Sequence, residues 1–189
     1  LMRRIFAEGA FSQAFIPVLA DQKHEGDHEL TKKFIGDVWG TLGAILFVVS
    51  VIGVFVAPLI AFIFVPGWYF DKQEQYQLTV LLLRFTTPYI LFISLVACAG
   101  GILNSYGKFA VPAFTPVLLN ICLIMATIFM APHFSNPQVG IACGVFIAGA
   151  AQLLFQLPFL FKLNVLARPR WGWSTPAVKK IVKLMLPSI

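Results

Sequence analysis

The chain has 189 residues, of which 59% are hydrophobic and 12% are charged. An ordinary soluble domain carries about 25% charged residues, so this composition excludes a typical soluble fold. The formal net charge is +6 at pH 7, which would indicate nucleic-acid binding only if the basic residues gathered on one exposed surface.

Long runs without Asp, Glu, Lys or Arg indicate where the chain crosses a membrane. Such runs extend over 38–70, 85–107 and 109–161. A membrane-spanning helix needs about 20 apolar residues. The first two runs can therefore hold one crossing each, and the third can hold two, separated by the polar stretch 132–138. The predicted fold class is an all-α polytopic membrane protein.

Taken in chain order, the sequence predicts about five transmembrane helices plus partial flanking helices. The expected helices are 1–20, 34–64, 77–105, 111–130, 139–163 and 177–189. Loops are expected at 21–33, 65–76, 106–110 and 164–176. Because Leu1 and Ile189 both lie inside apolar helical patterns, we expect the chain to be a fragment of a longer protein.

The basic residues predict how the helices are oriented. The loops 21–33, 106–110 and 164–176, with the residues next to them, hold ten Lys and Arg residues, whereas the two intervening loops hold only Lys72. Basic residues collect on the cytoplasmic side of multi-pass membrane proteins. We therefore expect these three loops in the cytoplasm, and this topology accounts for the basic excess without a nucleic-acid partner.

Motifs that would indicate an enzyme are weak. The stretch HEGDH at 24–28 fits the H-E-x-x-H pattern of zinc proteases, but it lies in an expected polar loop and no third ligand is apparent. No phosphate-binding loop, nucleophile elbow or CxxC pair is found. The cysteines Cys98, Cys122 and Cys143 fall inside expected spans, as small packing residues do. We expect a protein without catalytic residues, metal or cofactor.

Charged residues within apolar segments are the candidate functional residues. On a helix, Arg4 and Glu8 are four positions apart and can pair, whereas Arg3 shares its face with alanines. Arginines in such places either extend to the lipid headgroups or face a cavity. In a cavity, a guanidinium can bind a phosphate or carboxylate through two parallel hydrogen bonds. Arg84, inside the span 77–105, has the same two alternatives.

Three stretches carry a family resemblance. They are RRIFAEGAFSQAFIPVLA at 3–20, FTTPYILFISLVACAGGILNSYGKFAVPAFTPVLLNI at 85–121 and AAQLLFQLPFL at 150–160. The first resembles the signature after the second helix of the MurJ (MviN) lipid II flippase family. The others resemble that family's fourth, fifth and sixth helices. The family belongs to the superfamily of multidrug, oligosaccharidyl-lipid and polysaccharide exporters.

The resemblance implies part of the N-terminal lobe of a two-lobe flippase in the bacterial cytoplasmic (inner) membrane. Such a transporter moves lipid II, the undecaprenyl-diphosphate-linked peptidoglycan precursor, to the outer leaflet by alternating access, and so serves cell-wall biogenesis and cell shape. Its partners would be lipid II, membrane lipids and the remaining helices of the transporter. Arg3 matches a cavity arginine thought to engage the diphosphate, and Glu8 matches the glutamate of the motif. The residues assigned to substrate binding are Arg3, Arg4, Glu8 and Arg84.

Other functions make different predictions. A flippase for another polyprenyl-diphosphate oligosaccharide would have similar features. A same-fold drug or cation antiporter should prefer acidic cavity residues, of which the spans offer almost none. A non-transporting cell-wall scaffold predicts that Arg3 is dispensable. An intramembrane protease predicts that His24 or His28 is essential.

Overall fold

The structure is all-helical, as the sequence predicts. A computed structural model of the chain describes residues 15–21, 28–166, 170–173, 175, 176, 178 and 179. The elements are α2 (His28–Phe64), α3 (Pro66–Asp71), α4 (Gln73–Thr86), α5 (Tyr89–Ser105), α6 (Ala110–Met125), the π-helix η2 (Ala126–Met130), the 3-10 helix η3 (Ala131–His133) and α7 (Pro137–Lys162). Residues 15–21 are also helical.

Four stretches of the described part are long and apolar enough to cross a membrane. They are His28–Phe64, Gln73–Ser105, Ala110–His133 and Pro137–Lys162. The two expected flanking helices, 1–20 and 177–189, lie largely outside the described residues. The polytopic all-α fold class is therefore confirmed through these four spans.

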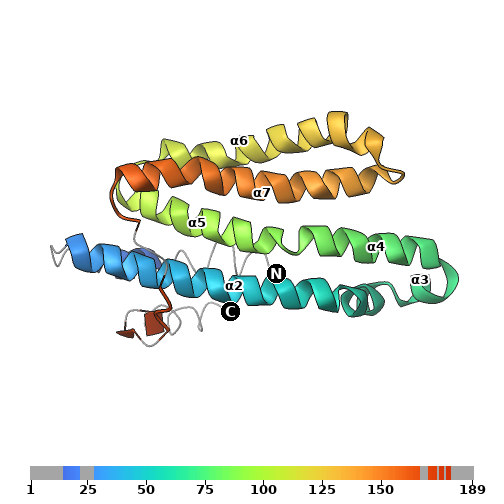
Figure 1. The fold of residues 1–189 in the computed structure, drawn as a ribbon, viewed down its shortest axis with the longest axis horizontal. Coiled ribbons are helices and arrows are strands. Elements are labelled where there is room, and N and C mark those ends of the chain that lie inside the picture. The colour runs from blue at the N-terminus through green and yellow to red at the C-terminus, as the bar shows by residue number, and fades with distance from the viewer. Residues whose placement is uncertain (1–14, 22–27, 167–169, 174, 177, 180–189) are drawn as a thin grey trace.

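The long helices lie side by side, and successive spans run in opposite directions along the long axis of the bundle (Figure 1). α2 runs the length of the bundle, α4 and α5 return in line, α6 runs out again and α7 returns. α7 packs against both α5 and α6, while α2 packs against α4 and α5. The α4/α5 pair therefore lies between α2 and α7, and it is the element that both flanking helices contact.

The two ends of the bundle differ in chemistry. The end where α2 begins and α7 ends is called here the basic end, because it carries Lys32, Lys33, Lys108, Lys162 and Arg170. The opposite end carries α3 and η3 and is called the aromatic end, after Trp68, Tyr69, Phe70 and Phe134. Within the aromatic end, the Tyr69 ring meets the rings of Phe62 and Tyr76 edge-on, with centroids 5.4 and 5.2 Å apart.

The main apolar core lies at the basic end. Phe15 and Leu19, both 0% exposed, enter it from residues 15–21 and pack with residues of α2 and α5. The Phe15 ring stacks on Phe34 at a centroid distance of 5.9 Å. A smaller cluster of Ala57, Ala61 and Val80 joins α2 to α4. The basic end is thus the more tightly closed end of the described bundle.

Small residues allow α7 to approach its neighbours closely. A Cβ added at Gly140 would lie 2.7 Å from the Ala131 backbone, and one added at Gly144 would overlap the Ala126 side chain. Lipid tails are as apolar as the side chains, so helices associate in a membrane through such van der Waals fit rather than through hydrophobic burial. The Gly140-x-x-x-Gly144 pattern therefore sets the crossing of α7 with η2 and η3.

The span expected at 77–105 corresponds to Gln73–Ser105, and a short turn between Thr86 and Tyr89 divides it into α4 and α5. Pro88 has no N–H, so it cannot donate to the carbonyl of Arg84, four residues earlier. The Leu83 carbonyl, one residue before Arg84, accepts both the Thr87 N–H at 2.8 Å and the Thr87 hydroxyl at 2.6 Å. α4 and α5 are therefore two helices in line.

Other expected boundaries also shift. The loop expected at 21–33 is helical from His28 onward, so α2 begins six residues before the expected position 34. Glu29 in its first turn favours this start, because a negative charge stabilises the positive end of the helix dipole. The helix expected at 111–130 begins at Ala110, and its last turn, from Ala126, is a π-helix.

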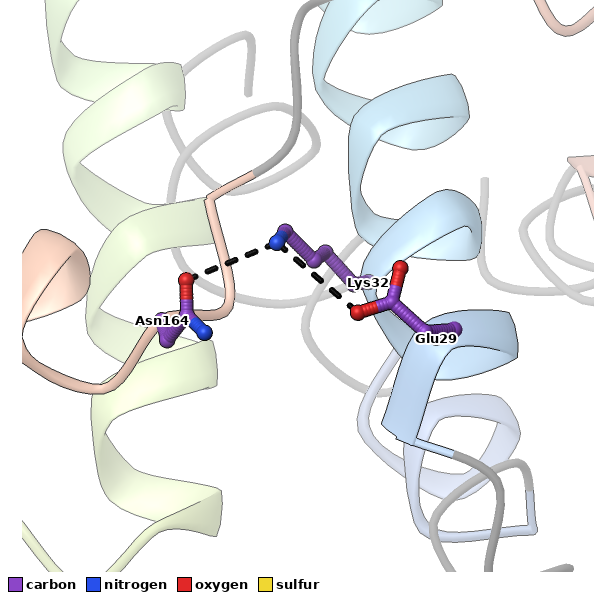
Figure 2. Close-up of polar contacts among 3 residues, drawn as sticks. All are labelled: Glu29, Lys32 and Asn164. Atoms are coloured by element: carbon purple, nitrogen blue, oxygen red, sulfur yellow. Dashed lines mark hydrogen bonds and ion pairs between the residues drawn. The ribbon is translucent and has the colours of Figure 1, made fainter.

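A polar contact joins the first turn of α2 to the end of α7 (Figure 2). The Lys32 ammonium donates to the Asn164 side-chain oxygen at 3.4 Å and lies 3.9 Å from the Glu29 carboxylate. Asn164 has φ +53°, the left-handed conformation that commonly ends a helix. The Glu29 side chain is 80% exposed, so this ion pair contributes at most about 1 kcal/mol. The contact connects the start of α2 to the residue that follows α7.

Candidate functional site

The arginine motif is only partly within the described residues. Arg3, Arg4 and Glu8, three of the four predicted site residues, lie outside them. The end of the motif is described, and there Phe15, Val18 and Leu19 are buried in the core against α2 and α5. A Cβ added at Gly101 would lie 3.7 Å from the Phe15 ring. The described end of the motif, from Phe15 onward, is therefore packed into the core.

Arg84, the fourth predicted site residue, lines a groove in the aromatic half of the bundle. The groove has a volume of about 530 Å³. Its lining comprises Pro58 of α2, Asn136 at the N-cap of α7, and Glu74, Tyr76, Gln77, Leu78, Val80, Leu81 and Arg84 of α4. Five of these, Glu74, Gln77, Leu78, Leu81 and Arg84, follow the spacing of one helix face. This groove is called the Arg84 groove below.

The Arg84 guanidinium forms no hydrogen bond or ion pair with any residue of the described part. Glu74 lines the same groove but is ten positions away on α4, which is about 15 Å along the helix and too far for pairing. The Tyr76 hydroxyl is already used, since it donates to the Pro58 carbonyl at 2.8 Å. That bond fixes the start of α4 against α2 and so shapes the groove wall.

A second concavity lies further along the same helices. It has a volume of about 350 Å³ and is lined by Phe47, Ser50, Val51, Val54 and Phe55 of α2, by Pro88, Leu91 and Phe92, and by Phe146 of α7. Ser50 is the one hydroxyl in an otherwise apolar lining. This concavity is called the apolar groove below. Among the residues that line the apolar groove, Pro88 lies closest in the sequence to Arg84, four residues after it.

The sequence reasoning missed a set of buried polar residues. Gln156 of α7 is 0% exposed, and neither its amide nitrogen nor its oxygen has a partner in the described part. One turn earlier, the Gln152 amide donates to the Thr115 carbonyl at 2.8 Å, while its oxygen has no partner there. The available signal was two glutamines four positions apart in a run without charges.

The first glycine pair of the sequence, Gly36 and Gly40, packs against a loop rather than a helix. The Arg170 backbone N–H donates to the Gly36 carbonyl at 3.2 Å. A Cβ added at Gly40 would overlap the Arg170 backbone. The neighbouring Trp171 and Trp173 remain 67% and 45% exposed, with their rings stacked 6.4 Å apart. The loop therefore presents two indoles outward at the basic end.

The zinc-protease pattern is only partly described. His28 begins α2 and is exposed, while residues 24–27 lie outside the described part. Within the residues described, no group of three or more His, Cys, Asp and Glu side chains is placed to hold a metal ion.

Four crossing helices with charges gathered at the ends define a multi-pass membrane protein. Comparison with known proteins narrows this class. The sequence matches the family described as "Lipid II flippase MurJ" over residues 1–189. It is 46% identical to the "Probable lipid II flippase MurJ" of Vibrio cholerae and 40% identical to the "Lipid II flippase MurJ" of Burkholderia cenocepacia. Both alignments cover 100% of this chain and 37% of the relative.

A solved structure described as "Lipid II flippase MurJ, inward closed conformation" has the same fold. It superposes with a TM-score of 0.73 at 26% identity, over 99% of this chain and 37% of the other. The chain therefore belongs to the MurJ lipid II flippase family, whose members are transporters of the bacterial inner membrane rather than enzymes. It spans 37% of the length of the relatives named here.

Proposed function

We propose that the complete protein moves lipid II from the inner to the outer leaflet of the cytoplasmic membrane by alternating access. The observation that carries this proposal is the family match along all 189 residues, arginine motif included. This chain supplies helices of one lobe, and the remaining helices of the transporter are its partners. The reaction makes and breaks no bond in the lipid, so the work of the protein is to bind, enclose and release it.

The proposed orientation places the basic end in the cytoplasm. Lys32, Lys33, Lys108, Lys162 and Arg170 lie at that end, whereas Lys72 lies at the aromatic end. Lys and Arg near span ends favour the cytoplasmic side. The loops 21–33, 106–110 and 164–176 would then be cytoplasmic, and the Arg84 groove would lie in the outer half of the membrane.

The proposed substrate-binding residues have different roles. A diphosphate carries negative charge that a guanidinium can meet with two hydrogen bonds. We assign this role to Arg3, with Arg4 and Glu8 as the charged pair beside it, on the cytoplasmic side where lipid II is made. Arg84 stands apart from this motif in the sequence and faces its own groove.

The test of this function uses the complete gene in bacteria depleted of their own lipid II flippase. The measurement is lipid II exposed on the outer leaflet, with protein level in the membrane determined in parallel. We expect the parent gene to restore exposure and Arg3→Ala to abolish it. Arg170→Ala is the matched control, since it removes an exposed basic side chain from the basic end outside the motif.

Two other outcomes would contradict parts of this proposal. If Arg3→Ala works as well as the parent, Arg3 extends to the headgroups and does not bind the diphosphate. If the well-expressed parent fails to expose lipid II, the substrate is a different lipid-linked molecule or the protein does not transport.

A further inference from the structure

The Arg84 groove and the apolar groove are bounded by the same three parts of the fold. Each is lined by α2, by the α4/α5 pair and by α7 or its N-cap. The first contributes Arg84 and the second Pro88, which are four residues apart and so one turn, about 6 Å, along the chain. A charged groove thus lies next to an apolar one along one pair of helices.

The Arg84 side chain is exposed at its groove and is available to an anion or water there. It lies eleven residues beyond the start of α4, or about 16 Å along the helix. A charge at such a depth is costly unless it is paired or faces a water-filled cavity. It has no pairing partner in the described part, and the other polar groups on the lining, Gln77 and Asn136, are neutral. The Glu74 carboxylate lines the same groove but lies ten positions earlier on α4, about 15 Å away and out of hydrogen-bonding reach.

The apolar groove suits a hydrocarbon chain. Phe47, Val51, Phe55, Leu91 and Phe146 line it. It lies on the side of Arg84 toward the middle of the bundle, since α5 continues from Pro88 toward the basic end. A lipid in the leaflet at the aromatic end has the same arrangement, with its headgroup outward and its chain toward the bilayer centre.

We propose that this face binds a phosphate-bearing lipid of the outer leaflet, with the phosphate on Arg84 and the first part of the chain in the apolar groove. The outward placement rests on the orientation in the proposed function. In a lipid II flippase, the site would hold the polyprenyl diphosphate after translocation, before release. The same chemistry also fits an anionic phospholipid, and the experiment separates the two.

The test uses the complete protein in detergent, with its cysteines replaced by alanine and one cysteine introduced at Gln77, which lines the groove. The rate of labelling by a sulfonate-bearing methanethiosulfonate is measured without lipid and with undecaprenyl diphosphate, phosphatidylglycerol or undecaprenol. Undecaprenol has the same chain without phosphate. Thr79→Cys is the control position, because Thr79 lies on the same helix but is not part of the groove lining.

We expect undecaprenyl diphosphate to slow labelling at Gln77→Cys about tenfold or more, and undecaprenol to have little effect. Arg84→Gln should remove the protection, and Arg84→Lys should keep part of it. Val51→Trp, which fills the apolar groove, should weaken it. Unchanged labelling at Thr79→Cys in the Arg84→Gln protein shows that α4 remains folded.

Protection that survives Arg84→Gln, or equal protection by undecaprenol, overturns the proposal. Equal protection by phosphatidylglycerol supports the lipid-phosphate site and identifies membrane phospholipid as an occupant. The outcome for the flippase function is separate. If the parent exposes lipid II but no lipid protects Gln77→Cys, only this binding site is refuted. If a lipid protects Gln77→Cys but the parent exposes no lipid II, only the transport of lipid II is refuted.

Discussion

The backbone N–H of Gly172 donates to the Thr41 hydroxyl at 2.9 Å, although the two residues are 131 positions apart. A Cβ added at Gly172 would overlap the Asp37 side chain. Asp37 is itself only 7% exposed. Two backbone N–H groups, those of Arg170 and Gly172, therefore bind the loop after α7 to α2. Gly40 on α2 and Gly172 on the loop allow this close approach, because neither has room for a Cβ.

This contact predicts opposite effects for two glycines of α2 that are three positions apart. Gly40→Ala forces the Arg170 backbone away and should destabilise the complete protein by about 1–3 kcal/mol. Gly43 has nothing within 4 Å of an added Cβ, so Gly43→Ala should be neutral or stabilise by about 0.5–1 kcal/mol through helix propensity. Thermal unfolding of the purified protein measures both. Equal effects would show that the loop does not pack on Gly40.

The exposed tryptophans of this loop should lie at the inner headgroup level. The loop contacts α2 at residues 36–41, and α2 ends at Phe64 beside the aromatic end. These points are about 35–42 Å apart along the helix, which is close to the bilayer thickness of about 40–45 Å including headgroups. Aromatic side chains such as Trp concentrate at both interfaces.

The measurement is fluorescence quenching by brominated lipids in proteoliposomes of variants that keep a single tryptophan. With Trp171 or Trp173 retained, bromine near the headgroup should quench more than bromine near the chain end. Trp68 at the aromatic end is the control for the opposite interface and should give the same depth preference. Stronger quenching by deep bromine at Trp171 would place the loop inside the hydrocarbon.

The crossing of α7 with η2 predicts a compensating pair. Gly144→Ala places a methyl group on the Ala126 side chain and should cost about 1–3 kcal/mol. Ala126→Gly removes the Ala126 methyl group that the new side chain would meet. The double variant should therefore recover most of the stability, apart from the helix-propensity cost of glycine, about 1 kcal/mol. Thermal midpoints of the four proteins form a double-mutant cycle. Additive losses would show that the two residues do not touch.

The buried glutamine of α7 predicts a gain on removal of its amide. Gln156→Leu keeps the approximate volume and eliminates two polar atoms that have no partner among the described residues, so it should stabilise the protein by about 1–3 kcal/mol. Gln156→Ala also removes the amide but leaves a cavity, so it should be less stable than Gln156→Leu by about 2 kcal/mol or more. If Gln156→Leu instead destabilises, the amide has a polar partner in the complete protein.

Some elements were predictable from local sequence and others were not. The four spans follow from charge-free runs such as 109–161, because membrane insertion depends on summed hydropathy. The break at Pro88 was visible only as a proline that permits a kink. The structure adds that the break divides α4 from α5 and that the Thr87 side chain beside it fills the space next to Gly53 of α2. The start of α2 at His28 was missed because the Gly26-Asp27 pair reads as a loop.

The sequence by itself determined the class of protein, the spans and, through its arginine motif, the family. Hydropathy, charge and motifs are properties of contiguous residues, so they can be read without knowing which distant residues lie close in space. Only the tertiary structure showed that Arg84 lines a groove shared with α2 and the N-cap of α7, and that Gly36 and Gly40 contact a loop. It also showed that the buried Gln156 amide has no partner within the described part of the chain. These features depend on the register between helices. That register is set by the close fit of small residues far apart in the chain, such as Gly144 against Ala126.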